Sequence, residues 1–374
     1  MGKQAHGGNL VWAAALAGCS PSAILDFSAS ISPLGLSANV LAAIQSQFGN
    51  IQHYPDPNYD DLRNALGHYH QLTSGWIMPG NGSAELLTLA GRELAELGLG
   101  ATVLLTPAFG DYYRALAAYD AKVLEFSLLS IHGHLSEFLD KKEIDIDASA
   151  ASRRVGQMTI NQGLILNNPH NPTGRLFRRE EVLPLLAKFA LVVVDEAFMD
   201  FLPPDEEQSL LGVVQDYPNL VILRSLTKFY CLPGLRLGYA VAHPSRLQRW
   251  QNWRDPWSVN CFASAAGIAA IQDREFQQRT WDWLPLARRQ LFDGLAQIPG
   301  LKPFESAANF LLVESEYSCD RIQEMLLKKY KILIRDCHSF SELGDRFFRV
   351  AVRTISENER LLAALKKEIE NFRF

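Results

Sequence analysis

Short apolar runs alternate with amphipathic helical patterns through most of the sequence. Six runs have the length and composition of buried strands, at residues 102–106, 122–128, 163–166, 191–195, 220–223 and 237–241. Helical periodicity lies between several of them, at residues 83–97, 110–119 and 178–189. Strands separated by helices predict an α/β fold with a mainly parallel sheet between helices, whose ligands gather at the carboxyl ends of the strands.

The N-terminal stretch imitates a secretory signal, because Lys3, the apolar residues 10–18 and Cys19 follow one another in that order. A single basic residue and a short apolar run favour instead an amphipathic helix that begins after Asn9 and ends before Pro21. We expect an extended piece and two helices to follow, at residues 25–28, 37–48 and 58–70. No stretch has the length needed to span a bilayer.

The pattern changes after about residue 245. A long polar helical stretch, near residues 261–297, leads to strands at residues 309–313, 332–335 and 347–352 and helices near 319–330 and 356–371. This order predicts a smaller α+β domain. We therefore expect three parts, which are an N-terminal segment (1–35) that packs on the small domain and the active site, a large domain (36–245) and a small domain (246–374).

Composition narrows the class of partner. The 374 residues are 48% apolar and 21% charged, which excludes disorder and suffices for two or three packed domains. A net charge of −5 gives no long-range attraction for nucleic acid or an anionic membrane, so an anionic ligand needs a local cluster of Arg and Lys. The spacing of the cysteines suggests neither a metal site nor disulfides, and we expect free thiols in a reducing cytoplasm. They are Cys19, Cys231, Cys261, Cys319 and Cys337.

The most informative stretch, residues 225–228 (SLTK), follows a predicted strand. Lys228 could be an ordinary surface cation. Ser225, three residues before it, and Arg236, eight residues after it, add a hydroxyl donor and a fixed cation, which suit a phosphate beside a nucleophilic amine. Nearby positive charge also lowers the pKa of a lysine and favours its neutral form.

Three other polar segments lie at predicted strand ends or helix starts. Asp195 ends a strand that should be buried on both faces, so its carboxylate needs a cation or must cap a helix. Residues 168–174 (NPHNPTG) specify a rigid turn, in which Asn171 can donate a hydrogen bond. Residues 80–85 (GNGSAE) form a glycine loop before a helix, where backbone N–H groups favour a phosphate.

These segments, in this order, resemble the fold type I pyridoxal-phosphate enzymes of the aspartate aminotransferase superfamily. The resemblance covers nearly the whole chain, and it implies pyridoxal 5′-phosphate as cofactor and a homodimer with shared active sites. Lys228 is then the residue that carries the cofactor, Asp195 pairs with the pyridine nitrogen and keeps it protonated, and Asn171 bonds the ring O3′. Phe109, which could otherwise be a core aromatic, matches the ring that stacks on the cofactor.

The same resemblance implies a binding site for the cofactor phosphate. Ser225, Arg236 and the backbone of Gly82, Ser83 and Ala84 would hold it. Tyr54 matches the tyrosine that reaches the phosphate of the neighbouring subunit. We expect no metal ion in the site.

Within the superfamily, the chain resembles the L-threonine-O-3-phosphate decarboxylases, with the histidinol-phosphate aminotransferases as the alternative. The matching features are residues 6–9 (HGGN), 26–29 (DFSA) with 33–35 (PLG), 223–230 with 233–239, 256–260 (PWSVN) and Phe198. Phe198 stands where the aminotransferases usually carry Tyr, and it cannot donate a hydrogen bond to O3′. The resemblance implies conversion of threonine phosphate to (R)-1-aminopropan-2-ol O-2-phosphate and CO2, for cobalamin synthesis. The alternative is transamination of histidinol phosphate with 2-oxoglutarate.

Two arginines near the end of the sequence share one face of a predicted strand. Arg349 matches the arginine that clamps the α-carboxylate of the substrate with its planar fork. Strand alternation puts Arg353 on the same face, where we expect an ordinary solvated cation.

Five further positions match substrate contacts of the decarboxylases. Arg335 corresponds to a residue that contacts the substrate phosphate, and His6 and Gly7 would join it, although a histidine there could also belong to a floppy terminus. Asn171 faces both cofactor and substrate. Ser30 stands where the decarboxylases have Asn, and its shorter side chain puts that contact in doubt.

Overall fold

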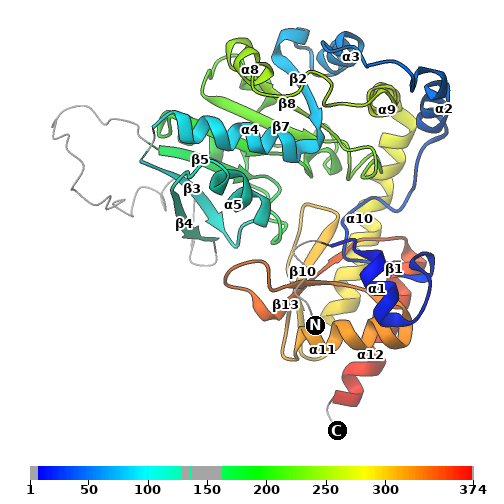
Figure 1. Ribbon diagram of the computed structural model, residues 1–374. Helices are drawn as coiled ribbons and strands as arrows, with labels where there is room; N and C mark the ends of the chain where they lie inside the picture. Colours follow the sequence, from blue (N-terminus) through cyan, green and yellow to red (C-terminus); the bar gives the residue numbers. More distant parts are fainter. Residues whose placement is uncertain (1–6, 99, 129–134, 136–161, 373–374) are drawn as a thin grey trace, which may run out of the picture.

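Seven strands form the larger sheet of the computed structural model, which describes residues 7–98, 100–128, 135 and 162–372 (Figure 1). They lie in the order β2-β8-β7-β6-β5-β3-β4, and among these described strands β8 alone runs in the direction opposite to the other six. Their bounds are β2 (Ile77–Asn81), β3 (Ala101–Thr106), β4 (Val123–Ser127), β5 (Gln162–Asn167), β6 (Leu191–Asp195), β7 (Leu220–Ser225) and β8 (Leu237–Ala242). The predicted mainly parallel α/β sheet is confirmed.

The sequence pattern does not predict β2, because its residues IMPGN include proline and glycine. β2 is an edge strand. Proline has no backbone N–H to donate, and an edge strand tolerates this because only one of its sides pairs with a neighbouring strand. Pro79 pairs in register with Tyr239 of β8. The strand runs directly into α4 (Gly82–Glu96), so β2 positions the glycine loop at the start of this helix.

Helices cover both faces of this sheet because successive strand residues point to opposite sides. Val193 belongs to a core with α4, α5 (Gly110–Ala117) and α8 (Pro244–Gln251). Val192 and Val194 face the other core, which includes residues of α3 (Asp60–His70) and α9 (Cys261–Gln272). All three valines are at most 1% exposed, so β6 is buried on both sides and its carboxyl end is held rigidly.

A four-stranded antiparallel sheet in the C-terminal part has the order β12-β13-β10-β9. The elements of this part are α10 (Arg274–Ala296), β9 (Leu301–Pro303), β10 (Phe310–Ser315), α11 (Cys319–Met325), β11 (Ile332–Leu333), β12 (Arg335–Cys337), β13 (Gly344–Ala351) and α12 (Ile355–Phe372). The expected helical stretch over residues 261–297 is not one continuous helix. It is interrupted at Asp273, which separates α9 from α10. Its side chain accepts a hydrogen bond from Phe276 N at 3.0 Å and so starts α10.

The N-terminal segment lies against this C-terminal part (Figure 1). The expected first helix is α1 (Leu10–Ala17), and Asn9 caps it by accepting from Trp12 N at 3.1 Å. β1 (Leu25–Asp26) then pairs in parallel with β11, and α2 (Ala38–Ser46) follows. The domain boundaries near residues 35 and 245 stay predictions.

Among the described residues, no helix is both long and apolar enough to cross a membrane. All five cysteines are free thiols, as expected from their spacing.

Candidate active site

A cavity of about 600 Å³ lies where the carboxyl ends of the central strands meet the C-terminal sheet and the N-terminal segment. Most of the predicted site residues line it. They are Gly7, Ser30, Ser83, Ala84, Phe109, Asn171, Asp195, Ser225, Lys228, Arg236, Arg335 and Arg349. The cavity brings residues from three separate parts of the chain to one place, as the carboxyl-end rule for parallel sheets requires.

Lys228 follows β7 and is held by a chain of hydroxyl groups. Its Nζ donates to Thr227 Oγ1 at 2.8 Å, and that oxygen lies 2.7 Å from Ser225 Oγ. Burial and the nearby Arg236 guanidinium lower the pKa of Lys228 from 10.5 to about 8. Thr227 lies within the sequence motif, but the sequence alone does not predict its role. Its hydroxyl group acts by contacting the side chains of Lys228 and Ser225.

The lowered pKa makes a prediction about the uptake of pyridoxal phosphate by the cofactor-free protein. The neutral amine is the nucleophile, so the rate of uptake should rise as the pH increases through about 8. Absorbance at a series of pH values from 6 to 11 measures this rate. A midpoint near 10.5 would mean that neither burial nor Arg236 acts on the amine.

Asp195 ends β6 inside the cavity and is 8% exposed. Its Oδ2 accepts from Tyr112 Oη at 2.7 Å, and its Oδ1 accepts from Ala197 N at 3.1 Å. Burial raises the pKa of this carboxyl group, while the hydrogen bond from Tyr112 opposes the rise. A cation placed beside Asp195 would remove this burial penalty.

Sequence reasoning does not find Tyr112, although its position three residues after Phe109 is a usable signal. Phe109 is the N-cap residue of α5, so Tyr112 follows it by about one helical turn. The two rings meet edge to face, with their centroids 5.8 Å apart. Tyr112 therefore joins the expected stacking ring to the carboxylate.

The start of α4 and Arg236 form one side of the cavity. Gly82 has φ +75°, and a Cβ atom there would lie 2.6 Å from Arg236 Nη2. A Cβ atom on Gly238 would lie 2.6 Å from Ser83 N. Both glycines thus let the guanidinium group and the strand approach the first turn of the helix, where N–H groups and the helix dipole favour a phosphate.

Arg349 and Asn171 contact each other at the opposite side of the cavity. Arg349 Nη1 donates to Asn171 Oδ1, which leaves the amide N–H groups of Asn171 as the donors for a ring oxygen. Arg349 Nη2 donates to Ser28 O at 3.2 Å. Burial lowers the pKa of Arg349 to about 10. Ser30 Oγ and Arg349 Nε are buried without a hydrogen-bond partner among the described residues, which fits a polar ligand in this cavity.

Arg335 lies directly opposite Arg349, because the two residues are register partners of β12 and β13. Arg335 is 4% exposed, and its Nη2 donates to Ser339 Oγ at 2.6 Å. The expectation that Arg353 is a solvated cation is wrong. Its guanidinium donates to Asp26 O at 3.0 Å and pairs with Glu357 at 2.9 Å, so it ties β1 to the C-terminal part.

The N-terminal glycines reach the edge of this cavity. Gly8 N donates to Ser28 Oγ at 2.8 Å, and a Cβ atom on Gly7 would lie 2.3 Å from Ser28 O. Any larger residue at position 7 must therefore displace the segment. His6 lies outside the described residues.

Tyr54 is placed away from the cavity of its own chain. It is 80% exposed and stacks on Trp257, with ring centroids 4.5 Å apart. The expected role of Tyr54 at the neighbouring subunit stays a prediction.

The residues present fit a phosphorylated pyridine ring. The carboxylate of Asp195 suits a cationic ring nitrogen, the amide of Asn171 suits a ring oxygen, and Phe109 provides an aromatic face. The close approach of Arg236 to Gly82 makes a cradle for the phosphate. Lys228 lines the same cavity.

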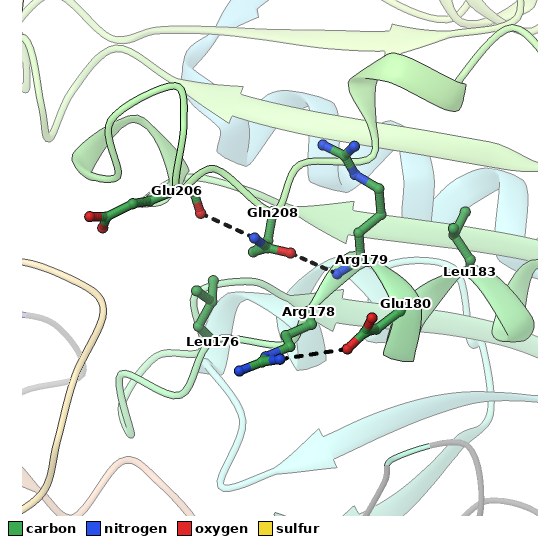
Figure 2. Close-up of a pocket in the computed structure, with 7 residues that line it drawn as sticks. All are labelled: Leu176, Arg178, Arg179, Glu180, Leu183, Glu206 and Gln208. Atoms are coloured by element: carbon green, nitrogen blue, oxygen red, sulfur yellow. Dashed lines mark hydrogen bonds and ion pairs between the residues drawn. The ribbon is translucent and has the colours of Figure 1, made fainter.

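Two other surface features lack the amine, carboxylate, aromatic ring and phosphate cradle that the active-site cavity combines. A hollow of about 620 Å³ is lined by Leu176, Arg178, Arg179, Glu180, Leu183, Glu206 and Gln208 (Figure 2). There Gln208 bridges Glu206 O and Arg179 N, and Arg178 pairs with Glu180 at 3.7 Å, so these polar groups satisfy one another. Elsewhere Asp320, His338 and Asp345 lie close enough together to hold a metal ion, and His338 Nε2 is 2.7 Å from Asp320 Oδ1.

Comparisons with known proteins agree with this geometry. Residues 22–365 match the family model described as "Aminotransferase class I and II". The chain is 38% identical to "Threonine-phosphate decarboxylase" from Salmonella typhimurium, covering 97% of this chain and 96% of that protein. It is 31% identical to "Histidinol-phosphate aminotransferase 2" from Ralstonia nicotianae, covering 94% and 90%.

A solved structure has the same fold. It is histidinol-phosphate aminotransferase from Sinorhizobium meliloti in complex with pyridoxal-5′-phosphate, with a TM-score of 0.83, 23% identity and coverage of 98% of this chain and 95% of that chain. The sequence family and the fold therefore agree over nearly the whole length. This chain belongs to the class I and II aminotransferase family.

Proposed function

We propose that this chain is a pyridoxal-phosphate-dependent L-threonine O-3-phosphate decarboxylase that forms (R)-1-aminopropan-2-ol O-2-phosphate and CO2. The observation that carries this proposal is the register pairing of Arg335 with Arg349, both of which line the cavity of Lys228. Two adjacent buried guanidinium groups suit a substrate with both a phosphate and a carboxylate. The similarity to the Salmonella decarboxylase supports the same activity, and we place the enzyme in cobalamin synthesis on that basis.

Pyridoxal phosphate, when bound, supplies a ring that accepts the electron pair released at the Cα atom of the substrate. Asp195, oriented by Tyr112, would keep the ring nitrogen protonated, and Asn171 would donate to the ring oxygen. Phe109 would provide the aromatic face for the ring. Further residues hold the phosphate of the cofactor, namely Ser225, Arg236, Gly82, Ser83 and Ala84.

Lys228 and the two arginines control the substrate. Arg349 binds the α-carboxylate and Arg335 binds the phosphate, so the substrate is fixed at both ends. This double hold would orient the Cα–carboxylate bond so that the bound cofactor could accept its electron pair. Lys228, with a pKa of about 8, then donates a proton to Cα after CO2 has left.

Histidinol-phosphate transamination is the alternative, favoured by the similarity to the Ralstonia aminotransferase. Histidinol phosphate has no carboxylate, so Arg349 would then serve the 2-oxoglutarate of the second half-reaction. Phe198 favours decarboxylation, since it replaces the usual tyrosine of the aminotransferases. Its ring packs edge to face on Phe310, with centroids 5.0 Å apart.

A single-turnover reaction with threonine phosphate labelled at the carboxyl carbon separates the two activities. We expect labelled CO2 to be released while the cofactor stays in its pyridoxal form. L-threonine serves as the control, and it should react far more slowly because it lacks the phosphate that Arg335 is proposed to bind. Accumulation of pyridoxamine phosphate without CO2 would refute the decarboxylase and support the aminotransferase.

We further propose a cytoplasmic homodimer in which Tyr54 of each subunit reaches the cofactor phosphate of the other. The exposed Tyr54 ring supports this, as do the nearby Phe48 and Ile51, which are 62% and 60% exposed. The five free thiols suit a reducing compartment. Analytical ultracentrifugation of the holoenzyme tests the dimer, and a monomer at micromolar concentration would exclude it.

A further inference from the structure

The loop formed by residues 338–343, called here the tongue, joins β12 to β13 and projects from the C-terminal sheet toward β4 (Figure 1). Its backbone includes Glu342 at φ +80°, a conformation that costs energy for any residue other than glycine. A non-glycine residue keeps such a conformation when its surroundings hold it in place, and the side chain of Glu342 makes two hydrogen bonds that do so.

Glu342 crosses from the tongue to the larger sheet with both carboxylate oxygens. Oε1 accepts from Thr106 Oγ1 at 2.5 Å, and Oε2 accepts from Ser127 Oγ at 2.7 Å. Thr106 and Ser127 are register partners at the carboxyl ends of β3 and β4. The tongue is therefore fastened through Glu342 to two neighbouring strands of the larger sheet.

The tongue also carries residues that shape the active-site cavity. Phe340 lines the cavity and is 3% exposed. Ser339 Oγ accepts from Arg335 Nη2 at 2.6 Å, so the position of the tongue sets the direction of this guanidinium group. A shift of the tongue would move both the wall of the cavity and the group expected to bind the substrate phosphate.

The folding of the tongue itself does not depend on Glu342. Phe340 and Leu343 pack with Leu312 and Cys337 in a small apolar core of the C-terminal sheet. Glu342 is exposed apart from its two hydrogen bonds. Its loss should therefore release the contact between the two sheets while leaving this apolar core in place.

We propose that Glu342 is a positioning residue, which fastens the tongue to β3 and β4 and thereby holds Arg335 and Phe340 over the substrate phosphate. This inference rests on the proposed function, because it assigns Arg335 to that phosphate. Glu342 acts through Ser339 and Arg335 and touches neither the substrate nor the cofactor.

Steady-state kinetics with L-threonine O-3-phosphate test the proposal in three variants of the holoenzyme. For Glu342→Ala we expect the KM to rise roughly tenfold with kcat changed less than about twofold, since binding of the phosphate end is weakened. Glu342→Gln should restore the KM, because the amide and the two hydroxyl groups can still exchange both hydrogen bonds. The matched control is Glu359→Ala, an exposed glutamate on α12, which should leave both constants unchanged.

Hydrogen exchange of peptides that cover residues 338–343 gives a readout that needs no activity. Exchange should be faster in Glu342→Ala than in the wild type, the Gln variant and the Glu359 control. Ser127→Ala removes one of the two hydrogen bonds from the partner side, and we expect a smaller effect in the same direction. This second variant keeps the test valid if Glu342→Ala does not fold.

The outcomes separate this inference from the proposed function. Unchanged exchange in Glu342→Ala would overturn the fastening role, whatever the enzyme decarboxylates. Faster exchange with an unchanged KM, or a fall in kcat alone, would overturn the positioning role. A wild-type enzyme that does not act on threonine phosphate would refute the proposed function, while the exchange data would still decide whether Glu342 holds the tongue.

Discussion

Replacing Lys228 with alanine is expected to lower the rate of threonine phosphate turnover by at least about ten-thousandfold. In the proposed function the amine is the nucleophile that binds the cofactor and the acid that protonates Cα, and among the described residues no other lysine lines the cavity. The absorption band of lysine-bound pyridoxal phosphate should disappear. The contacts of Ser225 and Arg236 should still retain some cofactor without a covalent bond. Absorption spectra and borohydride reduction followed by peptide mass spectrometry measure these effects.

Lys366→Ala provides the matched control for this experiment. Lys366 is exposed on α12, so its replacement removes the same charge without touching the cavity. This variant should keep the band, and reduction should label the peptide that contains Lys228. Persistence of the band in Lys228→Ala, or labelling of a different lysine, would show that the site assignment is wrong.

Replacing Arg224 with methionine is expected to lower the free energy of unfolding by about 3–5 kcal/mol. Arg224 is 1% exposed and pairs with Glu196 at 2.8 Å, with Asp200 at 2.6 Å and with Glu207. Burial acts to lower the pKa of Arg224, but the three carboxylates outweigh it and hold the pKa above its ordinary value. Methionine would leave these carboxylates without their cation. Urea unfolding measures the loss.

The pH dependence of this loss follows from the carboxyl groups. Burial already raises the pKa of Asp200 to about 6, and removal of Arg224 raises it further. Burial also raises the pKa of Glu196. Asp200 and Glu196 therefore bind protons more tightly in the folded variant than in the unfolded chain, so the variant loses stability as the pH rises through and above 6. The loss should therefore be larger at pH 8 than at pH 5.

An exposed ion pair serves as the control for Arg224. Arg289 pairs with Asp293 one helical turn away, and the two side chains are 68% and 44% exposed. Arg289→Met should cost less than about 0.5 kcal/mol. A loss of the same small size in Arg224→Met would contradict the argument that these carboxylates depend on Arg224 as their cation.

Much of the candidate site can be predicted from the sequence, because its residues lie in short motifs at the ends of strands. Ser225 and Lys228 flank one strand end, and Asp195 ends another. Their roles follow from the family resemblance and stay predictions. The roles of Tyr112 and Glu342 could not be predicted from the sequence, for a common reason. Each acts on a partner far along the chain, and neither lies in a motif whose letters carry chemistry.

The sequence by itself determined the order of strands and helices, the α/β class and the local motifs, because side-chain periodicity and turn chemistry are properties of neighbouring residues. The tertiary structure decided which of these pieces meet. It added β2 as an edge strand that tolerates Pro79, and it broke the expected long helix at Asp273.

At the cavity, too, local sequence determines the motifs and tertiary structure determines which residues meet. Arg349 reaches Asn171 across 178 positions of sequence, and Glu342 reaches Thr106 across 236. Such contacts depend on strand register and on the packing of one sheet against another, which no local pattern encodes. The local motifs therefore indicate the chemistry, and the packing of the two sheets places the charged groups that are proposed to bind the substrate.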